Sequence, residues 1–255
     1  MPLIKDQLSY RVSILPGDAH GSQLASYAER TLHLIQNIRP GVTFQISRHD
    51  FGGVALAAGH STALPDSTVD ACHKSDATIV CACGDSKYGI EPEKGLLTLR
   101  QELGASANIR PIKFPSARLA ELSAYKADQV ENLDITFFRD LTCGVYYGPK
   151  QEAGHDGEAY DTTVYSRQTI EKLARMAGTY ATQFTPPKSV HSIDKANVMA
   201  TSRLWRCVVT DIFTNEFPEV ELDHVLVDTA SMILSSHPCK LNGIVLSENM
   251  FGDIL

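Results

Sequence analysis

Apolar residues along this chain follow two spacings, one typical of strands and one typical of helices. Short apolar or alternating runs predict strands at 10–15, 43–49, 78–82, 133–138, 163–165, 189–193, 224–228 and 243–246. Apolar residues that recur every three or four positions predict helices at 22–38, 66–75, 93–103, 166–182 and 201–213. Because apolar strands alternate with helices, we expect an α/β fold built on a parallel sheet.

Polar residues mark the ends of several predicted elements. Asp66, Ser166 and Thr169 are candidate helix caps. Asp228 and Asp253 each follow an apolar strand, which is where α/β proteins place ligand groups. Paired aspartates of this kind suit Mg²⁺ or Mn²⁺, although a helix cap or a turn also explains an aspartate at a strand end.

The bulk composition excludes some functional classes. The chain has 255 residues, 43% hydrophobic content and a net charge of −7. An acidic chain without a basic block has no electrostatic footprint for nucleic acid or for a membrane surface. There is no signal-peptide pattern and no apolar run long enough to span a membrane, so we expect a cytoplasmic protein. The six cysteines are spread along the chain, and reduced thiols are expected.

Three arginines and one lysine are candidates for the chemistry. Arg139 directly follows the apolar run Ile135–Phe138, so its guanidinium group must find an anion. If Arg100 and Arg110 converged with it, the three groups would suit a substrate with two carboxylates, whereas individually they could be surface charges. Lys195 could act as a general base if burial lowered its pKa, and the alternative is a surface lysine beside an acid.

Eight segments occur in a specific order along nearly the whole chain. They are LPGDAHG (15–21), PEKGLLTLR (92–100), NIRP (108–111), RDLTCGVYYG (139–148), YDTTVYSR (160–167), SIDKANVMATSRLWR (192–206), VDTASM (227–232) and SENMFGDIL (247–255). This series resembles the 3-isopropylmalate dehydrogenases. They belong to the metal-dependent, β-decarboxylating hydroxyacid dehydrogenases, together with the isocitrate and tartrate dehydrogenases.

The resemblance implies a two-domain α/β fold that differs from the Rossmann fold. The first domain would contain residues 1–105 and 251–255 and would be incomplete, and the second would contain residues 106–250 with the dimer-forming region. The implied reaction is the oxidation of a 2-hydroxy acid by NAD, followed by loss of the neighbouring carboxylate as carbon dioxide. A homodimer with shared active sites is implied, because Lys195 and Asp228 would be donated across the interface.

The same resemblance assigns roles to individual residues. Tyr146 would be the general acid that protonates the enol carbon, and Lys195 the base that helps to remove the hydroxyl proton. The metal, Mg²⁺ or Mn²⁺, would be held by Asp228 and Asp253. The remaining assignments are Arg100, Arg110 and Arg139 for the malate carboxylates, Leu96 and Leu97 for the alkyl group, and Glu93 and Asn197 for the cofactor.

The apolar pair Leu96 and Leu97 indicates the substrate class. An apolar pocket discriminates poorly between alkyl groups that differ by a methylene. The expected substrate is therefore 3-isopropylmalate or a bulkier 3-alkylmalate, in leucine biosynthesis or in a chain-elongation step of specialised metabolism. Some positions depart from the family pattern, among them Ala19-His20 in place of Gly-Ile, Asp140 in place of Glu, and Cys143 in place of Gly.

In the family, the FGDIL motif continues with Ser-Asp-Glu, which supplies a further metal ligand, and a later loop binds the adenosine of NAD. The sequence stops before both, at Leu255. We therefore expect an incomplete or truncated form of an active enzyme. The alternative is a catalytically impaired pseudoenzyme that dimerises with a full-length relative.

Overall fold

The computed structural model describes residues 8–114, 116–155 and 157–255, which form two compact units. The first unit ends at Gly104, and the second runs from Ala105 to Leu255. Each unit has its own sheet and its own apolar clusters. Residues 251–255 differ from the prediction, which placed them in the first domain. They lie in the second unit because they form most of the last helix, which packs against a strand of that unit.

The first unit contains a three-stranded parallel sheet with the order β2 (Val42–Arg48), β1 (Leu8–Gly17), β3 (Ala77–Ala82). Its helices are α1 (Gly21–Ile38), α2 (Gly53–Ala57), α3 (Asp66–His73) and α4 (Glu91–Glu102), with a 3₁₀ turn η1 (Ser86–Tyr88). Successive side chains of β1 point to opposite faces. Val12 and Ile14 therefore pack with Ala25 of α1, while Leu15 packs with Cys72 of α3 and Leu99 of α4.

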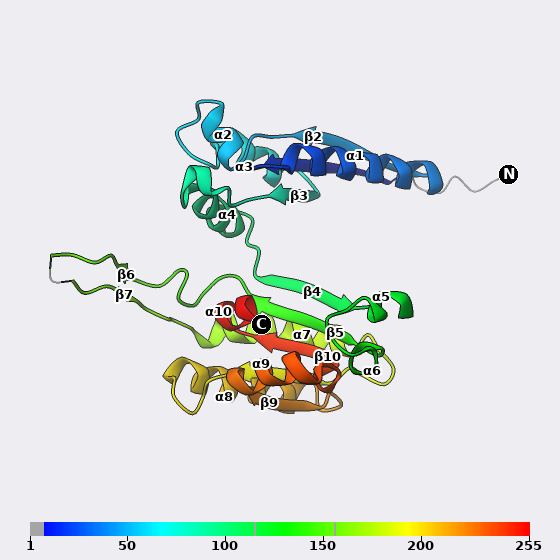
Figure 1. Ribbon diagram of the computed structural model, residues 1–255, viewed down its shortest axis with the longest axis vertical. Coiled ribbons are helices and arrows are strands. Elements are labelled where there is room, and N and C mark those ends of the chain that lie inside the picture. The colour runs from blue at the N-terminus through cyan, green and yellow to red at the C-terminus, as the bar shows by residue number, and fades with distance from the viewer. Residues whose placement is uncertain (1–7, 115, 156) are drawn as a thin grey trace. The chain divides into compact units, whose positions relative to one another are not determined.

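The second unit is built on a five-stranded sheet, drawn in green to red in Figure 1. Its order is β4 (Ala107–Lys113), β5 (Asp134–Asp140), β10 (Gly243–Ser247), β8 (Val190–Asp194), β9 (Leu222–Leu226). Only β4 is antiparallel to its neighbour among these strands. The helices are α5 (Ala117–Glu121), α6 (Ala127–Val130), α7 (Arg167–Ala181), α8 (Ala200–Glu216), α9 (Val227–Ser236) and α10 (Asn249–Ile254), with a 3₁₀ turn η2 (Pro238–Leu241).

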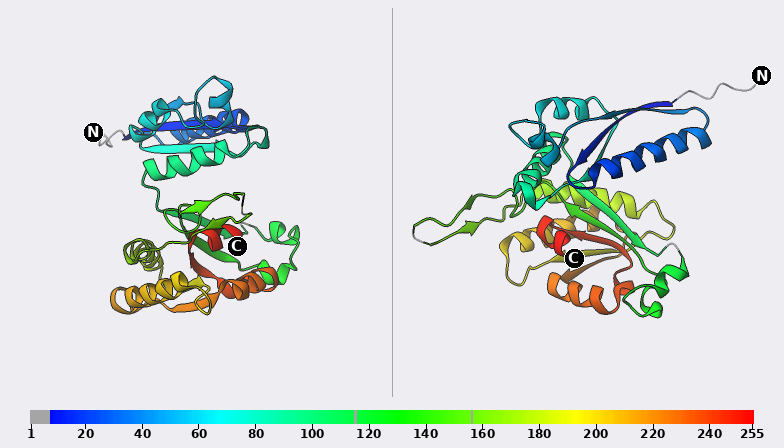
Figure 2. Two further views of the ribbon diagram at one scale, coloured as in Figure 1. Left: turned by 90° about the vertical axis from the view of Figure 1, so that its left-hand side faces the viewer. Right: turned by 45° about the horizontal axis from the view of Figure 1, so that its top comes forward.

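Both faces of this second sheet are covered, which explains why its strands read as continuous apolar runs. On one face, Ile244 and Leu246 of β10 share a cluster with α7 and α8. On the other face, Val245 packs with Ala230 of α9 and Leu241 of η2. The short strands β6 (Lys150–Gln151) and β7 (Tyr160–Asp161) form an antiparallel hairpin that extends away from the sheet, as the right view of Figure 2 shows.

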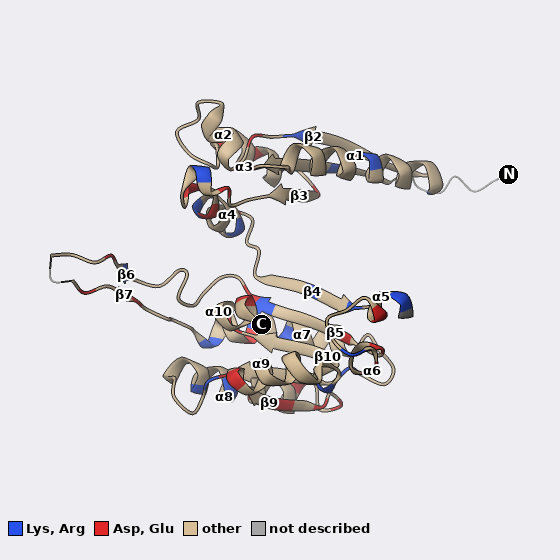
Figure 3. Cartoon of the chain, viewed as in Figure 1, with Lys and Arg blue, Asp and Glu red and all other residues tan. Residues whose placement is uncertain are grey.

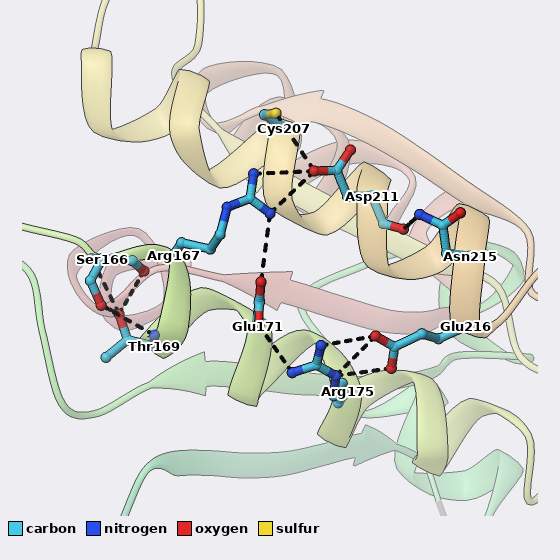
Figure 4. A network of polar contacts seen from close by, with 9 residues as sticks. All are labelled: Ser166, Arg167, Thr169, Glu171, Arg175, Cys207, Asp211, Asn215 and Glu216. Atoms are coloured by element: carbon cyan, nitrogen blue, oxygen red, sulfur yellow. Dashed lines mark hydrogen bonds and ion pairs between the residues drawn. The ribbon is translucent and has the colours of Figure 1, made fainter.

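An ion-pair network joins α7 to α8 on their solvent side (Figure 4). Arg175 of α7 pairs with Glu171 at 3.1 Å and with Glu216 of α8 at 2.9 Å. Arg167 pairs with Asp211 of α8 at 3.2 Å. Exposed pairs of this kind contribute little individually, and most of the helix pairing comes from the buried cluster beneath them.

Most of the predicted elements are confirmed, with ends shifted by a few residues. Ser166 is confirmed as the N-cap of α7, where its side chain and that of Thr169 form a capping box. The cap at Asp66 is wrong by one position, because Pro65 is the N-cap residue and Asp66 lies in the first turn. The strand at 163–165 is also wrong. This extended segment pairs with no strand, and its Tyr165 side chain is buried against Trp205 instead.

Candidate active site

The carboxyl ends of β5, β10, β8 and β9 lie at one edge of the second sheet, because these four strands are parallel. Arg139 lies near the carboxyl end of β5, and Lys195 directly follows β8. Asp228 and Asp253 lie in α9 and α10, the helices that follow β9 and β10. Ligands of open α/β sheets bind outside this edge, so the sheet places these predicted residues along one ligand-binding edge.

Arg139 is the central cation of this edge. Its side chain is only 9% exposed, and its Nη1 pairs with the Asp253 carboxylate. Its Nε and Nη2 both donate to Oδ1 of Asn249, at 3.1 and 2.8 Å. Helix α10 can approach this closely because residue 252 is glycine, where a Cβ atom would lie 2.8 Å from Cγ of Arg139. The expectation that Arg139 finds an anion is met by Asp253.

Tyr146 shares the Asp253 carboxylate with Arg139. Its hydroxyl donates to Oδ2 of Asp253 at 2.6 Å, and the Arg139 guanidinium lies 5.9 Å from its ring centroid. Burial and the hydrogen bond to the Asp253 carboxylate raise the pKa of Tyr146 to about 12. The phenol is therefore protonated at neutral pH and is available as a proton donor.

Lys195 and Asp228 form a second pair at the same edge. The Lys195 ammonium donates to Oδ1 of Asp228 at 2.6 Å. This hydrogen bond, together with backbone N–H groups at the start of α9, lowers the pKa of Asp228. A general-base role for Lys195 requires this ion pair to open, because the amine must be free to accept a proton.

The loop that carries Lys195 is fixed by the buried residue before it. Asp194 is 1% exposed and accepts from Nε and Nη2 of Arg206 at 2.7 and 2.8 Å. It also accepts the N–H of Ala196 at 2.9 Å. Asn197, the predicted cofactor ligand of this loop, is exposed.

A small pocket of about 210 Å³ lies beside Arg139, and Arg110 and Asp253 are among the residues that line it. Arg110 comes from β4, where it pairs in register with Phe137 of β5. The predicted arginines at 110 and 139 therefore lie around one cavity of the second unit. Two guanidinium groups beside one cavity suit a ligand that carries carboxylates.

The predicted residues of the first unit share one face of helix α4. Glu93, Leu96, Leu97 and Arg100 are spaced i, i+3, i+4 and i+7, which places them side by side on a helix. Leu96 also packs against the apolar cluster of the unit, so it has a structural role in addition. Glu93 lies against the loop after β3, where a Cβ on Gly84 would be 2.7 Å from its carboxylate oxygen.

Several buried polar residues that organise the site were missed in the sequence. Asn249, Tyr165 and Asp140 connect to Arg139 through hydrogen bonds. In the first unit, the buried Asp18 accepts the N–H groups of Gly53, Gly84 and Asp85, and so joins loops that follow all three strands. Single buried polar residues give no periodic signal, and only their position within the quoted segments could have identified them.

The carboxylates at this edge have the chemistry of a hard-cation site. Asp228 and Asp253 supply oxygen ligands of the type that Mg²⁺ and Mn²⁺ prefer. In the structure each is neutralised by a different cation, Lys195 or Arg139. Among the described residues, no group of three or more His, Cys, Asp or Glu side chains converges. A bound metal would replace these cations as the partner of the aspartates.

Comparison with known proteins places the chain in a family. The family model of isocitrate/isopropylmalate dehydrogenase matches residues 11–255. The chain belongs to the isocitrate/isopropylmalate dehydrogenase family, whose members are oxidoreductases. It is 44% identical to the 3-isopropylmalate dehydrogenase of Diutina rugosa over 251 residues, which are 97% of this chain and 70% of that protein. The enzyme of the same name from Maudiozyma exigua is 42% identical and is covered to 69%.

Solved structures of other proteins share the fold. An isocitrate dehydrogenase from Methylococcus capsulatus superposes with a TM-score of 0.75 at 25% identity, over 96% of this chain and 68% of that one. A protein from Thermus thermophilus gives a TM-score of 0.78 at 21% identity, over 96% of this chain and 46% of that protein. The expected α/β fold of this family is thus confirmed.

In the part of the chain that the structure describes, no helix is long and apolar enough to span a membrane.

Proposed function

We propose that this chain catalyses the NAD-dependent oxidative decarboxylation of 3-isopropylmalate or a related 3-alkylmalate. The observation that carries the proposal is the arrangement of Arg139, Tyr146 and Asp253 at the carboxyl edge of the second sheet. It joins a carboxylate-binding cation, a proton donor and an oxygen ligand within one hydrogen-bonded group. The names of the curated relatives support the same reaction class.

The reaction has three steps, which are oxidation, decarboxylation and protonation. The C2 hydride of the malate passes to NAD⁺ and the hydroxyl proton leaves, which gives a 2-oxo acid. The bond from C3 to the neighbouring carboxylate then breaks, releasing carbon dioxide and leaving an enolate. Protonation of C3 gives the product. NAD⁺ supplies the hydride acceptor, and a divalent metal supplies Lewis-acid stabilisation of the oxygen at C2.

The residues of the second unit divide these tasks between them. Arg110 and Arg139 bind carboxylates, and Arg139 can exchange Asp253 for a substrate anion. Tyr146 is held as the neutral phenol that donates a proton to C3. Lys195 is the base that accepts the hydroxyl proton, which requires its ion pair with Asp228 to open, and Asp228 and Asp253 would hold the divalent metal.

On helix α4, Leu96 and Leu97 form the apolar contact for the alkyl group. Glu93 contacts the cofactor on one side of them, and Arg100 binds a carboxylate on the other. We propose Asn197 as a further cofactor contact. We also propose a homodimer, in which Lys195 and Asp228 complete the active site of the partner subunit.

The test is NADH formation, followed by its absorbance, by the purified chain with NAD⁺, Mg²⁺ and 3-isopropylmalate. Turnover that is abolished by EDTA and restored by Mg²⁺ or Mn²⁺ supports the proposal. Varying the alkyl group then measures the tolerance of the Leu96–Leu97 contact. A folded dimer that gives no NADH with any 3-alkylmalate would refute activity of this chain and would favour the pseudoenzyme alternative.

A further inference from the structure

Asn249 is a buried residue whose side-chain amide contacts Arg139 directly. It is the first residue of α10 and is 1% exposed. Its Oδ1 accepts from Nε and from Nη2 of Arg139. Its Nδ2 donates to the carbonyl oxygen of Cys143 at 3.1 Å, and its backbone N–H donates to the Tyr165 hydroxyl at 2.9 Å. Both groups of the side-chain amide are therefore used.

These bonds determine which part of the Arg139 guanidinium remains free. A guanidinium has five N–H donors in a fixed planar fork. Asn249 occupies the edge formed by Nε and Nη2, so a carboxylate cannot pair with both atoms of that edge. The Nη1 end contacts Asp253, and both Arg139 and Asp253 line the 210 Å³ pocket. An incoming carboxylate is thereby directed to the Nη end.

The backbone of Asn249 is held by a second set of hydrogen bonds. The Tyr165 hydroxyl that accepts the Asn249 N–H donates to Oδ2 of Asp140 at 3.3 Å. The Asp140 carboxylate also accepts the N–H of Cys143 at 2.9 Å and the hydroxyl of Thr142 at 2.8 Å. Asn249 is therefore connected to the body of the unit by a buried set of bonds, and not by α10 alone.

We infer that Asn249 is a positioning residue, which holds Arg139 by one edge so that its Nη end receives a carboxylate of the substrate. This inference rests on the proposed function for the identity of the substrate. Without the amide, Nε and Nη2 would lose their acceptor in a buried place, and the guanidinium would turn to satisfy them. The cation would then no longer present a defined end to the pocket.

The first test is steady-state kinetics of Asn249→Ala, with Asn215→Ala as the matched control. Asn215 is an exposed residue of α8 outside the site. We expect the KM for 3-isopropylmalate to rise roughly 10- to 100-fold in Asn249→Ala, because misplacing a binding group by about 1 Å costs up to about 10²-fold. The KM for NAD⁺ should stay within about twofold, and the control should match the wild type. Equal changes in both constants would indicate a merely structural role and would overturn the inference.

The second test does not need turnover. The Nε–H of Arg139 can be followed by ¹H–¹⁵N NMR, with its signal assigned by its loss in Arg139→Lys. In the wild type this N–H should exchange slowly with solvent, and in Asn249→Ala it should exchange at least about 10-fold faster. Unchanged exchange would overturn the inference. If the wild type forms no NADH but shows this dependence, the proposed function fails and the positioning role stands.

A third variant covers the case in which Asn249→Ala does not fold. Asn249→Asp keeps an acceptor for Arg139 but places a second carboxylate on the guanidinium. Slow exchange of the Arg139 Nε–H should persist, while 3-isopropylmalate should bind at least about 10-fold more weakly in calorimetric titration, because the added charge competes with the substrate. Fast exchange, or unchanged substrate affinity, would contradict the assigned geometry.

Discussion

Replacing Glu248 with glutamine should remove a pH-dependent loss of stability from the second unit. Glu248 is the N-cap residue of α10 and is 4% exposed. Its Oε1 has no hydrogen-bond partner among the described residues, and the nearby carboxylate of Asp140 accepts four hydrogen bonds from other groups. Burial, followed by the negative charge of Asp140, raises the pKa of Glu248 from 4.5 to about 7. The neutral acid is therefore favoured in the folded state.

Linkage between protonation and folding determines how the unfolding free energy changes with pH. Between pH 4.5 and about 7 the folded chain binds more protons at this site than the unfolded chain, so stability falls as the pH rises. The contribution is fully present below pH 4.5 and is lost above pH 7. A shift of this size corresponds to roughly 2–3 kcal/mol of unfolding free energy lost between pH 5 and pH 8, at about 1.36 kcal/mol per pKa unit.

The assay is urea unfolding at about pH 5, 6, 7 and 8, followed by tryptophan fluorescence. Trp205 is the only tryptophan of the sequence and is buried in the α7–α8 cluster, so the signal reports on the second unit. The neutral amide of Glu248→Gln cannot ionise, so the unfolding free energy of this variant relative to the wild type should grow by roughly 2–3 kcal/mol from pH 5 to pH 8. Glu219→Gln at an exposed site is the control. If the Glu248→Gln and wild-type profiles run parallel, the burial argument is wrong.

Three further changes test separate parts of the structure. Ala19 has a φ of +45°, a left-handed conformation that is strained for alanine but not for glycine. Ala19→Gly should therefore stabilise the first unit by about 0.5–1 kcal/mol, which is the strain that is relieved less the added chain entropy of glycine. Urea unfolding followed by circular dichroism measures this change. Ser166→Ala removes the capping box of α7 and should cost about 1 kcal/mol, visible as a lower urea midpoint in Trp205 fluorescence. Tyr146→Phe should lower kcat by about 10²- to 10⁴-fold with little change in the KM for 3-isopropylmalate, and a smaller loss would exclude Tyr146 as the acid.

The sequence predicted the elements well where a repeated pattern specified them. The strand around Val245 and the helix after Ser166 both rest on several apolar positions, and the helix also on a defined cap. The prediction of a strand at 163–165 was wrong because a run of three residues cannot show whether a neighbouring strand exists. In the structure the Tyr165 side chain packs against Trp205, which is distant in sequence.

The candidate site was predictable only in part. Arg139 could be identified because an arginine after an apolar strand requires an anion, but Asp253 as that anion depends on how α10 folds back on β5. Asn249 and Glu248 carry no signal in the pattern, since their importance comes from burial and from neighbours more than 80 positions away. The role of Lys195 stays a prediction that depends on the opening of its pair with Asp228.

The alternation of β10 has a consequence for how this chain can evolve. Ile244 and Leu246 belong to one core and Val245 to the other, and α10 begins two residues after the strand ends. Loss of a single codon within 243–247 would exchange the faces of every later side chain in the strand and draw Asn249 back by about 3.3 Å. The packing of both apolar clusters and the hydrogen bonds from Arg139 to Asn249 would be lost together. Insertions and deletions should therefore be absent here in related genes, whereas the loop that joins β6 to β7 should vary in length (Figure 1). Strand β10 carries no charged residue, as Figure 3 shows, which fits a strand whose five residues are all buried.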